Sequence, residues 1–589
     1  MFSYLVLSGE PSKVEEIFTR INKLISDQKS TTKNWLSDTF FVNTQFGISK
    51  MSSQRLWAYF AFSDNKKDLE RFVKQNNRGL CIINSSETNV DASDCLDWLS
   101  SHSIDDVPGK YDGGFSCVSI TRKNGFSSFN DFSGNVPVFY ASKHGVNLVS
   151  NVPKLISYVV NDSSDYDYLS LSWLITTGII YFDKSLYCNV NKLNPLKYIK
   201  AKIGGTSAFT LVPFKNTIFT QSNDLCSDLT NAEWDRIYNK LIKNTENYLG
   251  RLPDKRISIS GDKDSRLLLA LALSSSYKNE IEVFSDSTNH DYLADFCSAV
   301  GIKKFSSTPA EISNEQEDNS SDLLGTCQQF MKSYNQRSSL LSKTDNCFLS
   351  SLGGGLYRGT WWNQQFAESD FDNGGNKLYM KFINYSQSFD KSLLLSDYYR
   401  LAQIDQVSCW VTENLEHANN FLPEKFYLQN ILGNSCFINP FRSENYVFPL
   451  LSFEVAKLYC KLSMAARSKE LLHFNCMYRS DPKLCEYPFR NESWKQGLNG
   501  YKGINLKLAN TLHKERSTVQ MPLLKYISNN KEQAIQVFDD AQRSTDIDSI
   551  ISIDKLKNQL MSIRDDSSKV DILSILRGVA ICAMLGKSK

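Results

Sequence analysis

Hydrophobic and polar positions follow different patterns in the two parts of the chain. Residues 1 to about 215 carry short apolar and aromatic runs that Gly, Asn, Ser and Asp interrupt, for example at 114–120, 137–140 and 146–149. Such runs are typical of strands joined by tight turns. We therefore expect a sheet-rich N-terminal unit of the β-sandwich type.

The pattern changes after a polar stretch at 214–229. Helical periodicity begins at 234–242, and strands and helices alternate from Arg256 onward. A strand should run into a leucine-rich helix near 265, followed by a strand at 281–284, a helix over 292–300 that Gly301 ends, and a strand at 302–305. This alternation predicts a parallel, doubly wound α/β sheet. Helical additions should follow residue 388, including a buried terminal helix over 572–585.

Length and composition limit the classes of protein. A chain of 589 residues is too long for one core, and we expect domains at 1–215 and 230–589. A net charge of +2 disfavours a nucleic-acid partner. The fourteen cysteines show no C-x-x-C spacing, which indicates reduced, mostly buried thiols and gives no support to a zinc site. No leader and no membrane-spanning run is evident, so a cytoplasmic protein is expected.

The stretch at 256–269 carries the clearest candidate chemistry. Gly261 permits a close backbone approach, Ser260 and Ser265 offer hydroxyl donors, and the helix that follows turns its positive end toward the loop. This pattern favours phosphate binding, with Asp264 as a metal ligand. Neither the Walker spacing nor the dinucleotide fingerprint is present. The alternative is an ordinary strand-turn-helix in which Asp264 or Ser265 is the N-cap.

The loop resembles the S-G-G-x-D-S pyrophosphate loop of the ATP pyrophosphatase superfamily. The whole chain resembles asparagine synthetase class B, which joins a glutaminase-type (Ntn) domain to an ATP pyrophosphatase domain. Four N-terminal segments carry the resemblance: 112–118 (D-G-G-F-S-C-V), 131–140 (D-F-S-G-N-V-P-V-F-Y), 148–156 and 178–195. In the C-terminal part it rests on the loop and on 290–294, 352–359 and 439–442 (N-P-F-R).

The resemblance implies ATP and Mg²⁺ as cofactors. The residues expected to hold the nucleotide are Ser260, Gly261, Asp262, Lys263, Asp264, Ser265, Arg266, Gly353 and Gly354, with Asp264 and Asp262 on the metal and Lys469 and Arg358 in catalytic roles. Lys263 and Arg266 could instead be solvated cations on a first helical turn. Trp361 and Trp362 could line an acceptor pocket, although buried aromatics are a commoner explanation.

Three positions depart from the family pattern. Phe2 stands where glutamine-hydrolysing members expose a nucleophilic cysteine, so we expect an inactive glutaminase-like domain, as in β-lactam synthetases and lasso-peptide cyclases. Gly355 replaces an acidic metal ligand in the glycine loop. Asp262 replaces a glycine of the phosphate loop and would cost about 4 kcal/mol beside an unneutralised phosphate, so we expect it to bind or support the metal.

These residues predict an AMP-forming carbon-nitrogen ligase that activates a substrate carboxylate without hydrolysing glutamine. The substrate would be a peptide, sugar acid or other metabolite, and the amine would come from the same substrate or from solution. A biosynthetic partner protein or a homodimer is compatible with the sequence. The alternatives are a non-catalytic nucleotide-binding or scaffolding descendant, which Phe2, Asp262 and Gly355 favour, and RNA thiolation, which the near-neutral charge disfavours.

Overall fold

The structure is a computed structural model of the chain. It describes residues 2–27, 43–52, 55–63, 66–85, 91–161, 165–201, 209–219, 225–252, 254–286, 290–308, 347–359, 366, 376–386, 393–415, 421–437, 445–489, 493–495, 498, 501–504, 527–563 and 572–586.

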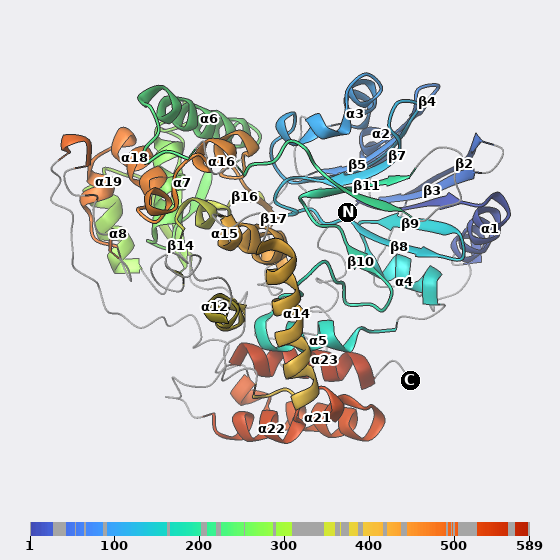
Figure 1. Ribbon diagram of the computed structural model, residues 1–589. Coiled ribbons are helices and arrows are strands. Elements are labelled where there is room, and N and C mark those ends of the chain that lie inside the picture. Colours follow the sequence, from blue (N-terminus) through green and yellow to red (C-terminus); the bar gives the residue numbers. More distant parts are fainter. Residues whose placement is uncertain are drawn as a thin grey trace.

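Two six-stranded antiparallel sheets form the N-terminal unit (Figure 1). Sheet A has the order β10 (Asn191–Lys192), β8 (Phe139–Lys143), β9 (Val146–Ser150), β1 (Phe2–Gly9), β3 (Arg55–Ser63) and β2 (Asn43–Ser52). Sheet B has the order β12 (Thr210–Pro213), β11 (Lys197–Ala201), β7 (Gly125–Asn130), β6 (Phe115–Thr121), β5 (Gly79–Ser85) and β4 (Val73–Asn76). The prediction of a sheet-rich unit joined by tight turns is confirmed.

The two sheets are stacked, with helices on both outer faces. Tyr4 and Val6 of sheet A share one core with Leu80 and Val118 of sheet B, because alternate residues of each strand face the other sheet. Helix α3 (Ala92–Leu99) covers the outer face of sheet B. Helices α1 (Pro11–Asp27) and α4 (Pro153–Asn161) cover that of sheet A, and α5 (Tyr168–Thr177) extends the same core. The unit therefore has four layers in the order helix, sheet, sheet, helix.

The second unit is built on a five-stranded parallel sheet. Its order is β15 (Phe305–Thr308), β14 (Glu282–Asp286), β13 (Arg256–Ser258), β16 (Cys347–Leu349) and β17 (Asn445–Val447). The chain moves outward from β13 to β15 and then returns to the other side of β13 for β16. Ligands of such sheets bind where this reversal occurs, at the carboxyl ends of the strands. The predicted parallel sheet is confirmed, although its third strand begins at Phe305 and not at Ile302.

Helices surround the parallel sheet and extend beyond it. They are α6 (Asn231–Leu249), α7 (Lys263–Leu273), α8 (His290–Ala299), α12 (Asn376–Ser386), α14 (Asp397–Leu415), α15 (Leu422–Phe426), α16 (Phe453–Tyr459), α17 (Met464–Arg467), α18 (Leu471–Ser480) and α19 (Lys483–Glu486). Helix α2 (Lys66–Phe72) belongs to the first unit. In the described part of the chain, no helix has the length and apolar character that a membrane span requires.

The last three helices pack on the first unit and not on the parallel sheet (Figure 1). Residues of α21 (Lys531–Ser544), α22 (Ile553–Met561) and α23 (Ile572–Gly586) share one core with Leu5 and Leu7 of β1. The predicted buried terminal helix is therefore present as α23, with Arg577 only 6 % exposed. The domain ranges 1–215 and 230–589 stay a prediction, because this core joins residues of both.

Asp112 lies where the two units meet. Its carboxylate accepts a hydrogen bond from the backbone N–H of Phe453 at 3.1 Å and pairs with Lys240 Nζ at 2.6 Å. Asp131, from the next resembling segment, is buried and accepts bonds from backbone N–H groups of its own turn, including Ser133 at 3.0 Å and Val136 at 3.2 Å. Both aspartates thus hold backbone in place.

Candidate functional site

The loop between β13 and α7 lies at the reversal point of the parallel sheet. Gly261 has φ of +83°, and a Cβ at this position would lie 2.6 Å from the ring of Tyr292, so the turn requires glycine. Ser265 Oγ accepts from the backbone N–H of Ser260 at 3.3 Å and lies 3.3 Å from the Ser260 hydroxyl. Asp262 is the N-cap of α7 and accepts from the backbone N–H of Ser265 at 3.0 Å. The two hydroxyls and the first turn of α7 therefore meet at one point.

This cap corrects one sequence expectation. The N-cap of α7 is Asp262, and neither Asp264 nor Ser265. An aspartate in extended conformation places its carboxylate on the N–H three residues later. The Asp262 carboxylate is thus engaged by the backbone. Its predicted role as a metal ligand stays a prediction.

Asp264 projects from the first turn of α7 toward the glycine loop that follows β16, and we call the region between these two loops, at the carboxyl ends of β13 and β16, the crevice. Nε2 of His473 donates to Oδ1 of Asp264 at 2.8 Å, and Nη1 of Arg358 lies 3.5 Å from Oδ2. Burial alone would raise the pKa of Asp264, but the His473 hydrogen bond and the Arg358 charge hold this pKa below its usual range. A Cβ on Gly354 would lie 2.7 Å from Oδ1 of Asp264. The glycine loop after β16 therefore approaches the carboxylate through its backbone.

A buried ion pair lies beside Asp264. Nζ of Lys263 contacts Oε2 of Glu470 at 2.7 Å, and each residue is 1 % exposed. The ammonium also lies 5.3 Å from the ring centroid of Trp494. Nε of Arg358 lies 3.5 Å from Oε1 of Glu470, so Arg358 bridges the two acids of the crevice. We call Lys263, Asp264, Arg358, Glu470 and His473 the crevice cluster.

Glu470 is held in an unusual backbone conformation. Its φ of +58° and ψ of +31° lie in the left-handed region, which costs a residue other than glycine about 1–2 kcal/mol. Oε1 of Glu470 and Nδ1 of His473 are buried and have no hydrogen-bond partner among the described residues. Strained residues and buried polar atoms of this kind concentrate at functional sites.

The side chain of Arg266 is buried behind the loop between β13 and α7. Its guanidinium donates to the carbonyl of Tyr487 at 2.7 Å and to that of Pro488, and lies 4.1 Å from the ring centroid of Phe489. Burial lowers its pKa. The alternative that Lys263 and Arg266 are solvated cations is wrong, because both are buried, Lys263 against Ser493 and Arg266 against residues 484–489.

The other predicted site residues fall into three groups. Gly353, with φ of +98°, and Gly354 lie at the crevice, as expected. Lys469 is exposed, and its neighbours Glu470 and His473 enter the crevice in its place. The segments 361–362 and 439–442 lie outside the described residues. Glu470 and His473 were not predicted as site residues, although their spacing of three at a helix start places both on one face.

No protein-family model matches the chain. No curated protein matches it either. The function therefore rests on the chemistry of the crevice and on the resemblance of short motifs.

The crevice offers oxygen donors that suit a magnesium polyphosphate. Mg²⁺ prefers oxygen ligands and is bound in nucleotide sites through one or two carboxylates together with substrate phosphates. Asp264 and Glu470 supply two carboxylates, and Ser260 and Ser265 supply hydroxyls.

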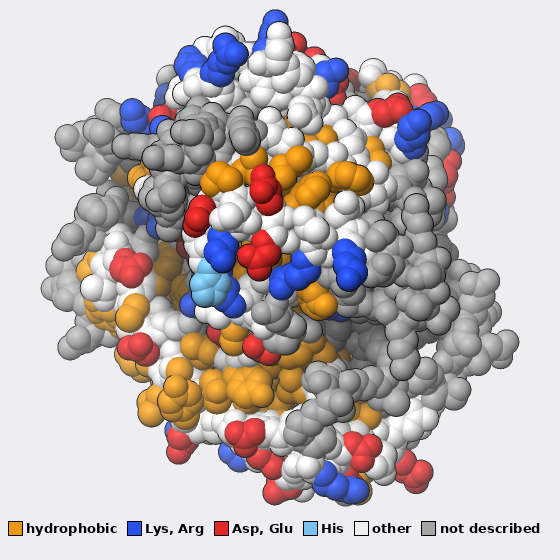
Figure 2. Space-filling model, turned by 90° about the vertical axis from the view of Figure 1, so that its right-hand side faces the viewer, with side chains coloured by type: hydrophobic (Ala, Val, Ile, Leu, Met, Phe, Trp, Pro, Cys, Tyr) orange, Lys and Arg blue, Asp and Glu red, His pale blue; other side chains and the backbone are white. Residues whose placement is uncertain are grey.

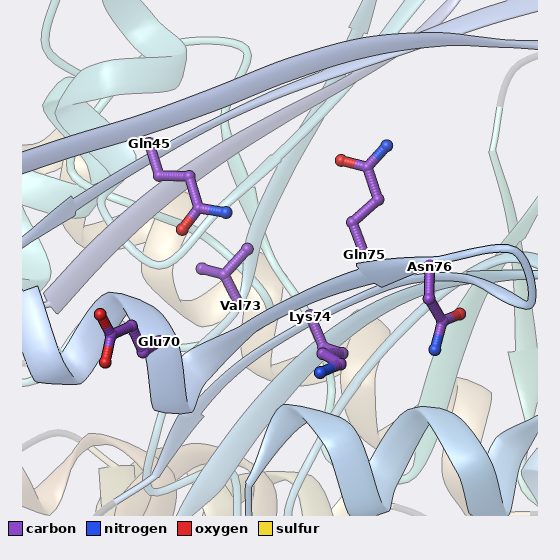
Figure 3. A pocket seen from close by; sticks show the side chains of 6 residues that line it. All are labelled: Gln45, Glu70, Val73, Lys74, Gln75 and Asn76. Carbon is purple, nitrogen blue, oxygen red and sulfur yellow. The ribbon is translucent and has the colours of Figure 1, made fainter.

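The N-terminal unit has a separate cavity of about 650 Å³ between the edge strands β2 and β4 (Figure 3). It is lined by Gln45, Glu70, Val73, Lys74, Gln75 and Asn76. None of these described residues is a cysteine, serine or threonine. Position 2 is an ordinary strand position, paired with Ser63. The absence of glutamine hydrolysis stays a prediction.

Charged side chains of both signs are interspersed with apolar ones on the face seen in Figure 2.

Proposed function

We propose that the chain is an ATP-dependent, AMP-forming ligase that activates a substrate carboxylate for amide formation. The observation that carries the proposal is the crevice cluster. Five ionisable side chains converge at the reversal point of a parallel sheet, beside a loop whose glycine turn and two hydroxyls suit a phosphate. Buried charges are costly and are rarely placed together without a chemical role.

Asp264 and Glu470 are the acids that would hold Mg²⁺ on the phosphates. A bound MgATP would supply an electrophilic α-phosphorus and a leaving pyrophosphate. Arg358 is close enough to both acids to move from carboxylate to phosphate oxygens, and a planar guanidinium suits such oxygens. In this reading Lys263 fixes Glu470, and His473 fixes Asp264.

The N-terminal unit would support the ligase without chemistry of its own. Phe2 offers no nucleophile, and Asp112 ties this unit to Phe453 and Lys240 of the second one. The four-layer order of helices and sheets suits the glutaminase-like resemblance. The amine would then come from the substrate itself or from solution, as in ring-closing relatives of the resembled family.

A second candidate, a non-catalytic scaffold, has one specific observation in its favour. Asp264 is already paired with Arg358 and hydrogen-bonded to His473, and the N-terminus of α7 is already capped by Asp262. Such a crevice would be a stabilising ionic core. It would then need no nucleotide.

Hydroxylamine trapping distinguishes the two candidates. The purified chain is incubated with MgATP, hydroxylamine and panels of uronic acids, amino acids and short peptides, and pyrophosphate, AMP and hydroxamate are measured. The ligase yields the three products in equal amounts, because hydroxylamine takes the acyl group from the adenylate. Asp264→Asn should lower this yield at least about a hundredfold, by analogy with the loss of one electrostatic group from an active site. The exposed Asp235→Asn on α6 is the matched control and should retain it.

Pyrophosphate release that Asp264→Asn leaves unchanged would place the reaction elsewhere. No product with any panel, together with no measurable MgATP binding, would establish the scaffold in place of the ligase.

A further inference from the structure

Three cysteines converge under helix α3, far from the crevice. Cys81 lies on β5, Cys117 on β6 and Cys95 on α3. The Sγ atoms of Cys81 and Cys117 are 3.6 Å apart, those of Cys95 and Cys117 are 3.9 Å apart, and all three lie within 4.8 Å of one another. Each residue is at most 1 % exposed. In the described part of the chain, this is the one group of three potential soft-metal ligands.

The strand register explains why the thiols meet. The Ser116 hydroxyl contacts the Tyr4 hydroxyl of sheet A at 3.3 Å, so the next side chain of β6, Cys117, points to the opposite face and toward α3. Cys81 lies diagonally across the β5–β6 pair on that same face, because Cys81 pairs with Ser119, two residues from Cys117. Helix α3 packs on this face and places the Sγ atom of Cys95 beside that of Cys117.

The geometry suits a tetrahedral or trigonal thiolate site. Zn–S bonds of about 2.3 Å at tetrahedral angles separate the sulfurs by about 3.8 Å, which is close to the 3.6 and 3.9 Å that separate Cys117 from Cys81 and Cys95. The hydroxyl of Tyr111 lies close enough to Cys95 to interact with it electrostatically and provides an oxygen at the edge of the cluster. Trp98 packs on Tyr111 with ring centroids 6.0 Å apart, and both rings pack against the apolar core that contains the sulfurs.

We propose that Cys81, Cys95 and Cys117 form a buried structural site for a thiophilic d¹⁰ cation, Zn²⁺ or Cu⁺. Binding forms one metal–sulfur bond per cysteine, and each thiol that binds loses its proton to solvent. Zinc leaves the smaller residual charge on three thiolates and gains Tyr111 as an oxygen neighbour. Copper would use the three sulfurs alone.

Metal analysis of the full chain tests the site. The protein is expressed with added Zn²⁺ or Cu⁺, purified with a non-chelating reductant, and analysed by mass spectrometry of the elements and by X-ray absorption. We expect about one ion per chain with about three sulfurs at about 2.3 Å for zinc. An additional light scatterer identifies the zinc form, and its absence with shorter bonds identifies copper.

Cys95→Ala should lower metal retention at least about tenfold, as expected for the loss of a direct ligand. Cys460→Ala, another fully buried cysteine that has no second thiol beside it among the described residues, should leave retention unchanged. If Cys95→Ala fails to fold, the native chain still gives an answer. Titration with a mercurial should then release the ion in step with the blocking of three buried thiols.

Less than about 0.1 ion per chain from either metal would overturn the proposal. So would retention that Cys95→Ala does not change, or a Cys81–Cys117 disulfide in the protein purified without reductant and with no metal.

Discussion

The two units of the molecule bury different kinds of polar group. Between and around the sheets of the first unit, most buried polar side chains are hydroxyls and amides, such as Ser116, Ser128 and Asn130. Its few buried charged side chains include Asp131, which backbone N–H groups hold, and Lys192, which donates to Asn434. Around the parallel sheet, buried polar groups include the full charges of Lys263, Arg266, Arg467 and Glu470.

This difference distinguishes polar groups that are buried as part of the packing from charged groups that are buried for a chemical role. A buried hydroxyl is satisfied by one nearby carbonyl, as when Ser128 donates to the carbonyl of Cys117 at 2.9 Å. A buried charge needs a partner charge and several donors, and hydrophobic replacement of such a pair is often neutral or stabilising. The first unit is therefore organised for packing, whereas the crevice keeps charges that packing alone would not select.

The largest contrast should appear in stability. Lys263→Met leaves the Glu470 carboxylate without its closest cation and should lower the free energy of unfolding by about 3–5 kcal/mol, as expected when one partner of a buried ion pair is removed. Tyr4→Phe, at the hydroxyl pair between the sheets, should lower it by about 1 kcal/mol. Urea unfolding of both variants measures the contrast.

The double variant Lys263→Met, Glu470→Leu is the control for this contrast. It removes both charges and should regain most of the stability that the single change loses. Equal losses in Lys263→Met and Tyr4→Phe would mean that the two units do not differ in this way.

A smaller loss of stability should show how much the contact between the first unit and helix α23 contributes. Gly178 has φ of +78° after α5, and a Cβ there would lie 2.6 Å from Nη2 of Arg577 on α23. Gly178→Ala should therefore lower the free energy of unfolding by about 1–3 kcal/mol. Gly503→Ala, which also has positive φ but no atom within 4 Å of a Cβ, isolates the backbone strain. If the two variants lose the same stability, the contact with α23 contributes nothing.

The smallest effect depends on pH. The pKa of Asp264 lies below its usual range, so its ionised form contributes stability above about pH 4, and this contribution is lost as the pH falls through the folded pKa. The difference in unfolding free energy between the native chain and Asp264→Asn should be constant from pH 5 to 7 and shrink below about pH 4. A difference that grows on acidification would show that Arg358, His473 and Glu470 do not stabilise the carboxylate as described.

The sequence predicted the local parts of this molecule. Apolar runs and turns indicated the sheets, and the change to helical spacing at 234–242 indicated the second unit, because these features depend on residues close in the chain. The strand, the turn at Gly261 and helix α7 were found for the same reason. Asp262 as the cap was missed because several loop residues could serve as N-cap and only the backbone geometry selects one.

The long-range parts could not be predicted. Glu470 and His473 reach Lys263 and Asp264 from more than two hundred residues later in the chain, and Cys95 reaches Cys117 only because α3 lies on sheet B. Likewise, no local pattern shows that α21–α23 join the core of the first unit. Spacing in a sequence specifies which residues share a face, whereas contacts between faces follow from the topology.

Calorimetric titration with ATP and Mg²⁺ tests the central claim most directly, namely that the crevice is a nucleotide site. The native chain should bind one equivalent, and Asp264→Ala combined with Ser265→Ala should abolish binding, whereas Asp235→Asn should retain it. Asp262→Gly should weaken the magnesium dependence if that carboxylate supports the metal. Binding that survives the Asp264 and Ser265 double change, or tighter ATP binding by Asp262→Gly with no turnover in the native chain, would contradict the account.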